Sequence, residues 1–169
     1  PATVYGVSKQ VAENLIRISG IPFTILRLSN VYGPGCRPNY NSVVATMCYR
    51  AARGLPLVIN GDGRQGRDFI YVDDVVRAFV LAGFESMSGA EKIFNVSSGK
   101  MVSIKQIVKQ VCRLHKNTKV EFLTDKKNVE ISYCCDPSKF FGKYSWRPRV
   151  SLSKGIEQAL SYYRGRKIT

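Results

Sequence analysis

The sequence predicts an α/β fold, because apolar residues at helical spacing alternate along the chain with short apolar runs typical of strands. The first helical stripe consists of Val4, Val7, Val11, Leu15 and Ile18. The chain has 169 residues, of which 44% are hydrophobic, with 14 Gly and 7 Pro, so disordered and collagen-like classes are excluded. This length is sufficient to bury a real core.

The first half of the chain is expected to hold two helices and three strands. Gly20 and Pro22 end the first helix, and residues 22–28 (PFTILRL) read as a strand. Residues 29–40 (SNVYGPGCRPNY) have the Gly and Pro density of a loop. A helix at 42–53, a strand at 56–59, a turn at 60–66 and a strand at 67–72 follow.

The second half continues the alternation. Asp73 or Asp74 can cap a helix that runs to about Phe84, because a carboxylate there accepts unpaired backbone N–H groups. Ser103 and Gln106 form a capping box for a helix over 104–114. The remaining expected elements are strands at 92–96 and 119–123 and helices near 137–144 and 153–164.

The formal net charge of +14 is concentrated in the C-terminal half and suggests a polyanionic partner. Residues 1–91 hold nine basic and seven acidic residues, whereas residues 92–169 hold seventeen and five. A nucleic-acid-binding module is therefore one hypothesis. It is disfavoured because we find no RNP-like aromatic run and no zinc spacing, and because the basic residues read as scattered instead of forming a helical stripe.

The remaining composition argues for a protein of a reducing compartment, the cytoplasm, with no membrane partner and no metal. No apolar run approaches the roughly 18 residues of a membrane span. The five cysteines include no C-x-x-C pair, so we expect them to be mostly small, buried apolar side chains.

Tyr5 and Lys9 form a Tyr-x-x-x-Lys pair on the first predicted helix. Residues four apart lie about 40° apart around a helix, so both side chains can reach one bound molecule. An ammonium beside a phenol favours the phenolate, which can act as a general base. Tyr163 and Lys167 match the same pattern, and for either pair alone a surface tyrosine beside a solvated lysine is the favoured alternative.

Other candidate residues lie in turns or at the ends of predicted strands. The segment 61–66 (GDGRQG) matches G-x-G-x-x-G, but a strand-like run follows it where a dinucleotide fingerprint needs a helix, so we interpret it as a turn. Asn30, Tyr32 and Arg67 lie at loop or strand ends, where Asn suits sugar hydroxyls and Arg suits a diphosphate. For each of the three alone, a surface loop role is favoured.

Taken in order, these motifs resemble the C-terminal portion of the extended short-chain dehydrogenase/reductase family, specifically its NAD-dependent nucleotide-sugar epimerases and dehydratases. The matching segments are YGVSKQVAENL at 5–15, ILRLSNVYGPG at 25–35, LPLVINGDGRQGRDFIYVDDVVRAF at 55–79, IFNVSSGKMVSIKQI at 93–107 and DPSKFFGKYSWRPRVSLSKGIEQALSYYR at 136–164. The resemblance covers nearly the whole chain.

The resemblance implies roles for individual residues. Tyr5 would exchange a proton with a sugar hydroxyl, and Lys9 would support its phenolate and bind the nicotinamide ribose. Leu28 and Ser29 would approach the nicotinamide, Asn30 the sugar and diphosphate, and Arg67 the diphosphate. Val58 and Asn60 would line the base pocket, although Asn60 cannot stack as the aromatic residue of many relatives does. Lys126 or Lys127 would replace an arginine that binds the phosphates.

The resemblance also implies the fold and the reaction. The fold would be the C-terminal part of a Rossmann-like doubly wound domain plus a smaller α/β substrate-binding lobe. Residues 1–30, together with segments at about 67–96, would belong to the former, and the rest of 31–169 to the latter. We expect a UDP-glucose 4-epimerase-like enzyme that uses NAD, with NADP as an alternative, on a nucleotide-diphosphate sugar. A 4,6-dehydratase, a decarboxylase and a 4-keto reductase are alternatives.

The resemblance finally implies a longer protein. The family's Gly-rich loop and the Ser or Thr that partners the tyrosine precede the segments matched here, so this chain alone is expected to be inactive. A homodimer is expected at full length. Without the preceding half, we expect the apolar face of the helix at 4–19 to be exposed.

Overall fold

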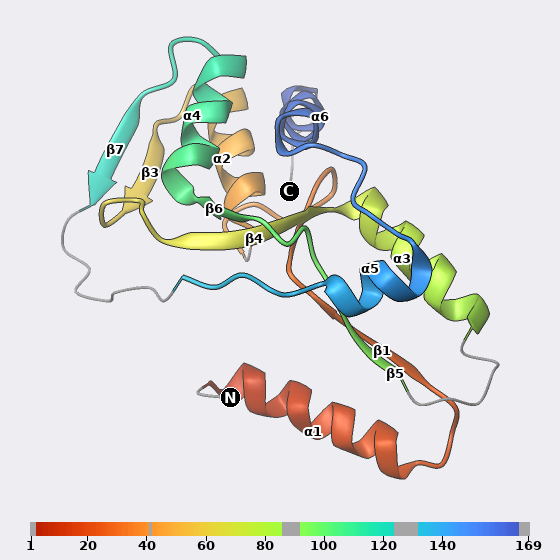
Figure 1. Cartoon of the computed structure of the whole chain (residues 1–169). Coiled ribbons are helices and arrows are strands. Elements are labelled where there is room, and N and C mark those ends of the chain that lie inside the picture. Colours follow the sequence, from red (N-terminus) through yellow and green to blue (C-terminus); the bar gives the residue numbers. More distant parts are fainter. Residues whose placement is uncertain (1–2, 41, 86–91, 124–131, 166–169) are drawn as a thin grey trace.

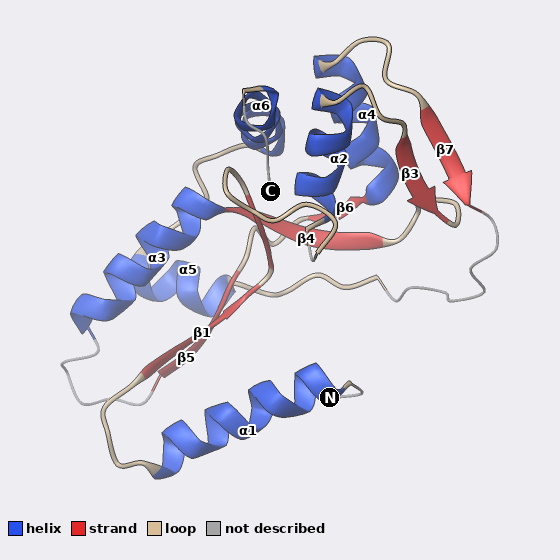
Figure 2. Ribbon diagram, turned by 180° about the vertical axis from the view of Figure 1, so that it is seen from behind, coloured by secondary structure: helices blue, strands red, loops and turns tan. Residues whose placement is uncertain are grey.

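The computed structural model describes residues 3–40, 42–85, 92–123 and 132–165, and its mixed architecture confirms the predicted α/β class (Figures 1 and 2). The elements in chain order are α1 (Val4–Ile18), β1 (Thr24–Leu28), β2 (Asn30–Tyr32), α2 (Val43–Ala52), β3 (Leu57–Asn60), β4 (Gly66–Tyr71), α3 (Val72–Glu85), β5 (Lys92–Val96), β6 (Met101–Ser103), α4 (Ile104–Leu114), β7 (Val120–Leu123), α5 (Ser138–Tyr144) and α6 (Leu152–Arg164).

The described strands form three small sheets. β1 pairs with β5 in parallel from Thr24 opposite Lys92 to Leu28 opposite Val96. β4 is the middle strand of the second sheet, parallel to β2 and antiparallel to β6, and β3 pairs with β7 in parallel. In both ribbon views, α1 lies on one side of the β1–β5 pair, and α3 and α5 lie on the other (Figures 1 and 2).

The helices begin and end close to the predicted positions. Ser103 and Gln106 form the expected capping box at the start of α4. The loop predicted at 29–40 instead contains β2, and β6 was not predicted. Both are three-residue strands that are held by pairing with β4, which a local pattern does not reveal.

The predicted cap of α3 is wrong. Asp73 and Asp74 lie within the first turn of α3 and not before it. The buried carboxylate of Asp74 instead accepts hydrogen bonds from the Arg149 and Val150 backbone N–H groups at 2.9 and 3.0 Å, and from the Arg77 side chain. Asp74 therefore fastens α3 to the segment that precedes α6.

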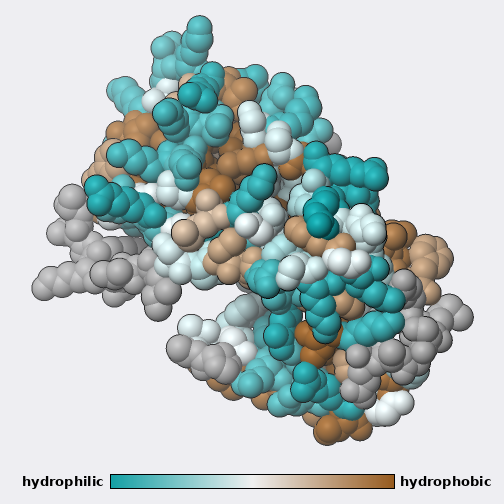
Figure 3. All heavy atoms as spheres, viewed as in Figure 1, coloured by the Kyte–Doolittle hydropathy of each residue, from teal (hydrophilic) through white to brown (hydrophobic). Residues whose placement is uncertain are grey.

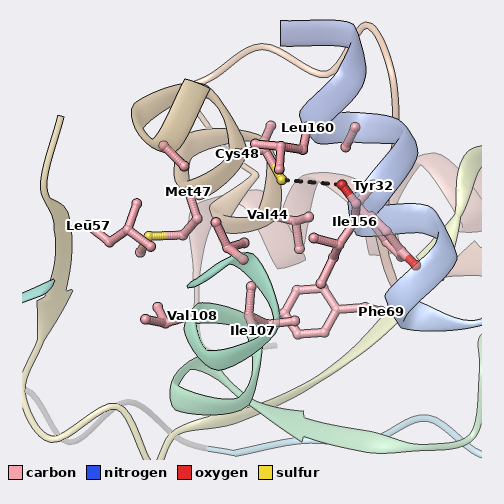
Figure 4. Close-up of a cluster of buried hydrophobic side chains, with 14 of the residues drawn as sticks. Tyr32, Val44, Met47, Cys48, Leu57, Phe69, Ile107, Val108, Ile156 and Leu160 are labelled. Carbon is pink, nitrogen blue, oxygen red and sulfur yellow. Dashed lines mark hydrogen bonds between the residues drawn. The ribbon is translucent and has the colours of Figure 1, made fainter. Parts of the chain in front are cut away.

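The larger hydrophobic cluster lies where α2 packs against α4 and α6 (Figure 4). It includes Val44, Leu57, Ile107 and Ile156. A second cluster joins β5, α3 and α5 around Phe94, Phe140 and Trp146. The chain thus has two packed regions that are linked by β2 and β4.

The five cysteines are free, but the expectation that most are buried is wrong. Cys48 is buried, and its thiol lies 3.8 Å from the Ile156 carbonyl oxygen. Cys134 is exposed, and the other three are half-buried. Burial raises the pKa of the Cys48 thiol to about 12, so this side chain acts as a small apolar residue.

The apolar stripe of α1 is exposed, as expected. Val4 is 89% and Ile18 is 80% exposed, and no described residue of α1 is buried. A two-pronged ion pair joins α1 to β1: Arg27 Nε and Nη2 donate to Glu13 Oε1 and Oε2 at 2.7 and 2.6 Å. This ion pair fastens α1, the helix that carries Tyr5, to the β1–β5 sheet.

The interpretation of the basic residues as scattered is wrong for α4. Lys105, Lys109 and Arg113 are exposed and recur every four residues, so they lie along one face of the helix. The opposite face is buried and consists of Ile104, Ile107, Val108 and Val111. α4 therefore presents a basic stripe, Lys105, Lys109 and Arg113, to solvent.

Candidate functional site

A cavity of about 910 Å³ opens where α1, the ends of β1 and β3, the start of β4 and the segment 132–135 meet. Figure 3 shows the surface hollowed between α1 and the body of the molecule. Seven predicted site residues line it: Tyr5, Leu28, Ser29, Asn30, Val58, Asn60 and Arg67. Lys9 is not among the lining residues, and Lys126 and Lys127 lie outside the described residues. The fold therefore brings together positions from four separate segments of the chain.

Tyr5 and Lys9 lie on the same face of α1, as their spacing predicts. The Lys9 Nζ atom is 5.4 Å from the centroid of the Tyr5 ring, and Tyr5 is 72% exposed. Thr3 caps the helix by accepting a hydrogen bond from the Gly6 N–H at 3.0 Å. The cap fixes the first turn of α1 and thereby presents the Tyr5 phenol to the cavity.

The carboxyl end of β1 supplies two adjacent polar side chains. The Ser29 N–H donates to the Val96 carbonyl at 3.1 Å, which continues the pairing of β1 with β5. The Asn30 side-chain amide donates to the Asp68 carbonyl at 3.0 Å. Because the ends of parallel strands are a common ligand-binding edge, these contacts place Ser29 and Asn30 where a ligand can reach them.

Asp68 organises this edge, and the sequence analysis did not identify it. Its buried carboxylate accepts hydrogen bonds from Ser29 Oγ at 3.1 Å, from Ser98 N and Oγ at 2.9 and 2.8 Å, and from Gly99 N at 2.9 Å. Cys134 Sγ lies 3.5 Å from Asp68 Oδ2. One carboxylate thus joins four segments behind the cavity, and burial together with Asp68 raises the pKa of Cys134.

Arg67 lies at the start of β4, against the ring of Tyr133. Its Nη1 donates to the Gly66 carbonyl at 2.9 Å, and its guanidinium carbon is 4.8 Å from the Tyr133 ring centroid. Among the described residues that line the cavity, Arg67 is the charged one, and no carboxylate lines it. The cavity therefore suits an anionic ligand.

Tyr133 is a site residue that sequence reasoning missed. It lines the cavity, and its hydroxyl oxygen is 3.2 Å from Asn30 Nδ2 and 3.3 Å from Asn30 Oδ1. Its position just before the matched DPSK segment is the signal that could have drawn attention to it. Contact across 103 residues of sequence is not visible in a local pattern.

Val58 and Asn60 lie at the end of β3, on the far wall of the cavity from α1. The Asn60 carbonyl accepts a hydrogen bond from Gln65 Nε2 at 3.1 Å, which closes the turn between β3 and β4. Gly61 and Gly63 in this turn have φ angles of 69° and 72°. Because β4 and not a helix follows, the Gly-rich segment 61–66 is a turn, as predicted.

Neither a metal nor a membrane site emerges from the described parts of the chain. They hold no group of three or more His, Cys, Asp or Glu side chains that could bind a metal ion. None of their helices is long and apolar enough to cross a membrane.

A family model described as the NAD dependent epimerase/dehydratase family matches residues 1–97, more than half of the chain. The chain belongs to this family. The match confirms the resemblance seen in the sequence and, with the solved structure below, the Rossmann-like character of the fold.

Three proteins illustrate the members of the family to which the chain is similar. A putative UDP-glucose 4-epimerase of Methanocaldococcus jannaschii is 29% identical over 100% of this chain and 56% of the relative. A dTDP-glucose 4,6-dehydratase of Haemophilus influenzae is 26% identical over 96% of this chain and 52% of the relative. The UDP-glucuronic acid 4-epimerase of Bacillus cereus, solved in complex with UDP-glucuronic acid and NAD, is 30% identical with a TM-score of 0.84, over 98% of this chain and 54% of that chain. The chain spans about half the length of these proteins.

Two residues of this chain could hold part of a bound dinucleotide. The Tyr5 phenol and the Lys9 ammonium lie together on α1, where they can donate hydrogen bonds to ribose hydroxyls. Tyr5 and Ser29 both line the cavity. Among the described residues, the segment 61–66 leads into β4 and offers no helix start for a pyrophosphate.

Proposed function

We propose that the intact protein is an NAD-dependent nucleotide-sugar 4-epimerase and that these 169 residues supply its sugar-nucleotide pocket and its acid/base pair. The observation that carries the proposal is the convergence of Tyr5, Asn30 and Arg67 on one cavity, whose described lining residues include no carboxylate. Relatives named as epimerases support it, because they match nearly the whole chain.

The pocket would bind the substrate by complementary charge and hydrogen bonds. Arg67 would hold the diphosphate through its guanidinium fork, and Asn30 would bind sugar hydroxyls through its amide. Val58 and Asn60 would contact the base, and Lys126 would add a positive charge near the phosphates. Because Asn60 offers an amide in place of an aromatic ring, the base would be held by hydrogen bonds more than by stacking.

The chemistry would be a reversible oxidation at sugar C4. Tyr5 as phenolate would take the proton of the C4 hydroxyl, and the Lys9 ammonium would stabilise that phenolate. NAD, held beside Tyr5 and Lys9, would supply a reversible hydride acceptor for C4, so that the hydride could be given back on the opposite face of the keto sugar. Tyr5 would then return the proton to the C4 oxygen, so that the product is the epimer and no net redox change occurs.

We also propose that the chain acts within a longer, two-domain enzyme. Residues 1–30 and about 67–96 would complete a dinucleotide-binding domain, and the remainder would form the substrate lobe. The second hydrophobic cluster supports the grouping of residues 67–96, because α3 and β5 pack together in it, and it also takes in α5 from outside those bounds. The exposed stripe of α1 would be covered in a homodimer or by the remainder of the enzyme.

Replacing Tyr5 with Phe tests the acid/base role. With UDP-glucose or UDP-galactose as substrate, Tyr5→Phe in the intact protein is expected to lower kcat by at least about a hundredfold, because no phenolate can take the proton. Affinity for UDP is expected to stay within about twofold, since Arg67 and the base pocket are unchanged. Turnover of the variant at the wild-type rate would show that another group transfers the proton.

A 4,6-dehydratase is the second candidate, favoured by the match to the Haemophilus influenzae enzyme. Both reactions begin with the same oxidation at C4, so the residues described here serve either. The product separates them: an epimeric UDP-hexose supports the epimerase, whereas a 4-keto-6-deoxy sugar from a UDP- or dTDP-hexose supports the dehydratase. A pentose or a reduced 4-keto sugar would indicate a decarboxylase or a reductase.

A further inference from the structure

We propose that Tyr133 is a positioning residue that holds Asn30 and Arg67 in the orientation in which they bind the sugar nucleotide. The inference rests on the proposed function. It deepens that function by naming one side chain that couples the sugar-binding amide to the diphosphate-binding guanidinium.

The backbone of the segment 132–133 is fixed to the start of β4. The Gly66 N–H donates to Ser132 Oγ at 2.8 Å, and the Tyr133 N–H donates to the Gly66 carbonyl at 3.2 Å. A side chain at position 66 would approach Met101 to within 2.6 Å, so glycine allows this close packing. The Tyr133 side chain is therefore carried into the cavity by a segment anchored next to Arg67.

The hydroxyl of Tyr133 orients the Asn30 amide. Asn30 Nδ2 already donates to the Asp68 carbonyl, and the Tyr133 hydroxyl oxygen lies 3.2 Å from Nδ2 and 3.3 Å from Oδ1. The phenol can accept from the first atom or donate to the second. Two partners on different sides fix the plane of the amide, so its remaining hydrogen-bonding capacity points in a defined direction.

The ring of Tyr133, in contrast to its hydroxyl, contacts Arg67. The guanidinium carbon lies 4.8 Å from the ring centroid, while Nη1 donates to the Gly66 carbonyl. A ring face stabilises a guanidinium stacked on it. The long Arg67 side chain is thus held against the cavity wall before an anion arrives, which lowers the entropy lost on binding.

The two contacts can be removed separately. Tyr133→Phe deletes the hydroxyl and keeps the ring under Arg67, whereas Tyr133→Leu deletes both. Tyr133 is 46% exposed, so neither change opens a cavity in a hydrophobic core. Tyr49→Phe is a matched control, because Tyr49 also lies against an arginine, Arg53 at 5.3 Å, but does not line the cavity.

The test is calorimetric binding of UDP and UDP-glucose to the intact protein, with dTDP and dTDP-glucose run in parallel. Tyr133→Phe is expected to weaken binding of the nucleotide sugar, UDP-glucose or dTDP-glucose, about three- to tenfold. Its affinity for the nucleoside diphosphate, UDP or dTDP, is expected to stay within twofold of the wild type. Tyr133→Leu is expected to weaken binding of the nucleoside diphosphate as well, by about two- to fivefold. In turnover, KM should rise with the binding loss while kcat stays within about twofold.

The outcomes separate the inference from the function on which it rests. If the wild type binds the nucleotide sugar and Tyr133→Phe binds it equally well, the positioning role is wrong while the proposed function stands. Equal weakening of both ligands by Tyr133→Phe, with a lower melting temperature, would mean a merely structural role and also overturn it. If the wild type binds neither nucleotide sugar, the proposed function itself fails.

Discussion

Asp68 joins the segments behind the cavity through a carboxylate that has only donors around it. Replacing it with Asn turns one acceptor oxygen into an N–H₂ group that faces the hydroxyls and backbone N–H groups of Ser29, Ser98 and Gly99. Asp68→Asn is therefore expected to lower the free energy of unfolding of the intact protein by roughly 2–4 kcal/mol, measured by urea denaturation.

Asp73→Asn serves as the control for that change. Asp73 is exposed in the first turn of α3, where a carboxylate contributes about 0.3–1 kcal/mol through the helix dipole. If the two substitutions destabilise the protein equally, the hydrogen bonds around Asp68 are not what holds this edge together.

The sequence identified the residues of the site that belong to contiguous motifs, but not those defined by distant contacts. Asn30 follows a predicted strand and Arg67 lies beside the predicted Gly-rich turn, and these positions identified them. Asp68 is next to Arg67, and its partners come from residues 29, 98, 99 and 134. A charged residue within the apolar run DFIY was nevertheless a signal, because a buried carboxylate needs several donors.

Elements were predictable where their signal is local. The capping box at Ser103 and the helix over 104–114 both depend on residues that are close together in the sequence, and both predictions were confirmed. β2 and β6 depend on β4, whose paired residues lie more than thirty positions away in the sequence, so their short sequences carry no strand signal of their own.

The contact between α1 and β1 is expected to respond to pH. Arg27 donates two hydrogen bonds to the Glu13 carboxylate and thereby holds the pKa of Glu13 below its ordinary value of 4.5, although slight burial opposes this. A pKa that is lower in the folded state adds stability above the ordinary value and loses it as the pH falls through the lowered one. The difference in melting temperature between wild type and Glu13→Gln should thus be constant near neutral pH and shrink as the pH falls below 4.5 and through the lowered pKa of Glu13.

Glu157→Gln provides the comparison, because Glu157 pairs with Lys154 within α6 and joins no separate elements. Since Arg27 is half-exposed, the ion pair with Glu13 should not contribute more than about 1 kcal/mol to the free energy of unfolding. A Glu13→Gln difference that persists unchanged at acidic pH would show that the charge of Glu13 does not stabilise the contact.

At the scale of the whole molecule, two groups among the basic residues behind the net charge of +14 have different consequences. Lys105, Lys109 and Arg113 form the basic stripe on the exposed face of α4, and like charges four residues apart weaken a helix slightly. Arg67 lies inside the cavity, where it is the charged lining residue among those described. General attraction of polyanions should therefore depend on the stripe, and recognition of a diphosphate should depend on Arg67.

Two sets of substitutions in the intact protein test this separation. The triple change Lys105→Gln, Lys109→Gln, Arg113→Gln is expected to lower the salt concentration that elutes the protein from heparin, because three exposed charges are lost, and to leave UDP-glucose affinity within twofold. Arg67→Gln is expected to leave elution from heparin nearly unchanged. It is expected to weaken binding of UDP-glucose at least about tenfold, because a charged hydrogen-bond donor to the diphosphate is removed. A several-fold loss of UDP-glucose affinity in the triple variant would contradict the assignment, since the stripe would then take part in binding the substrate.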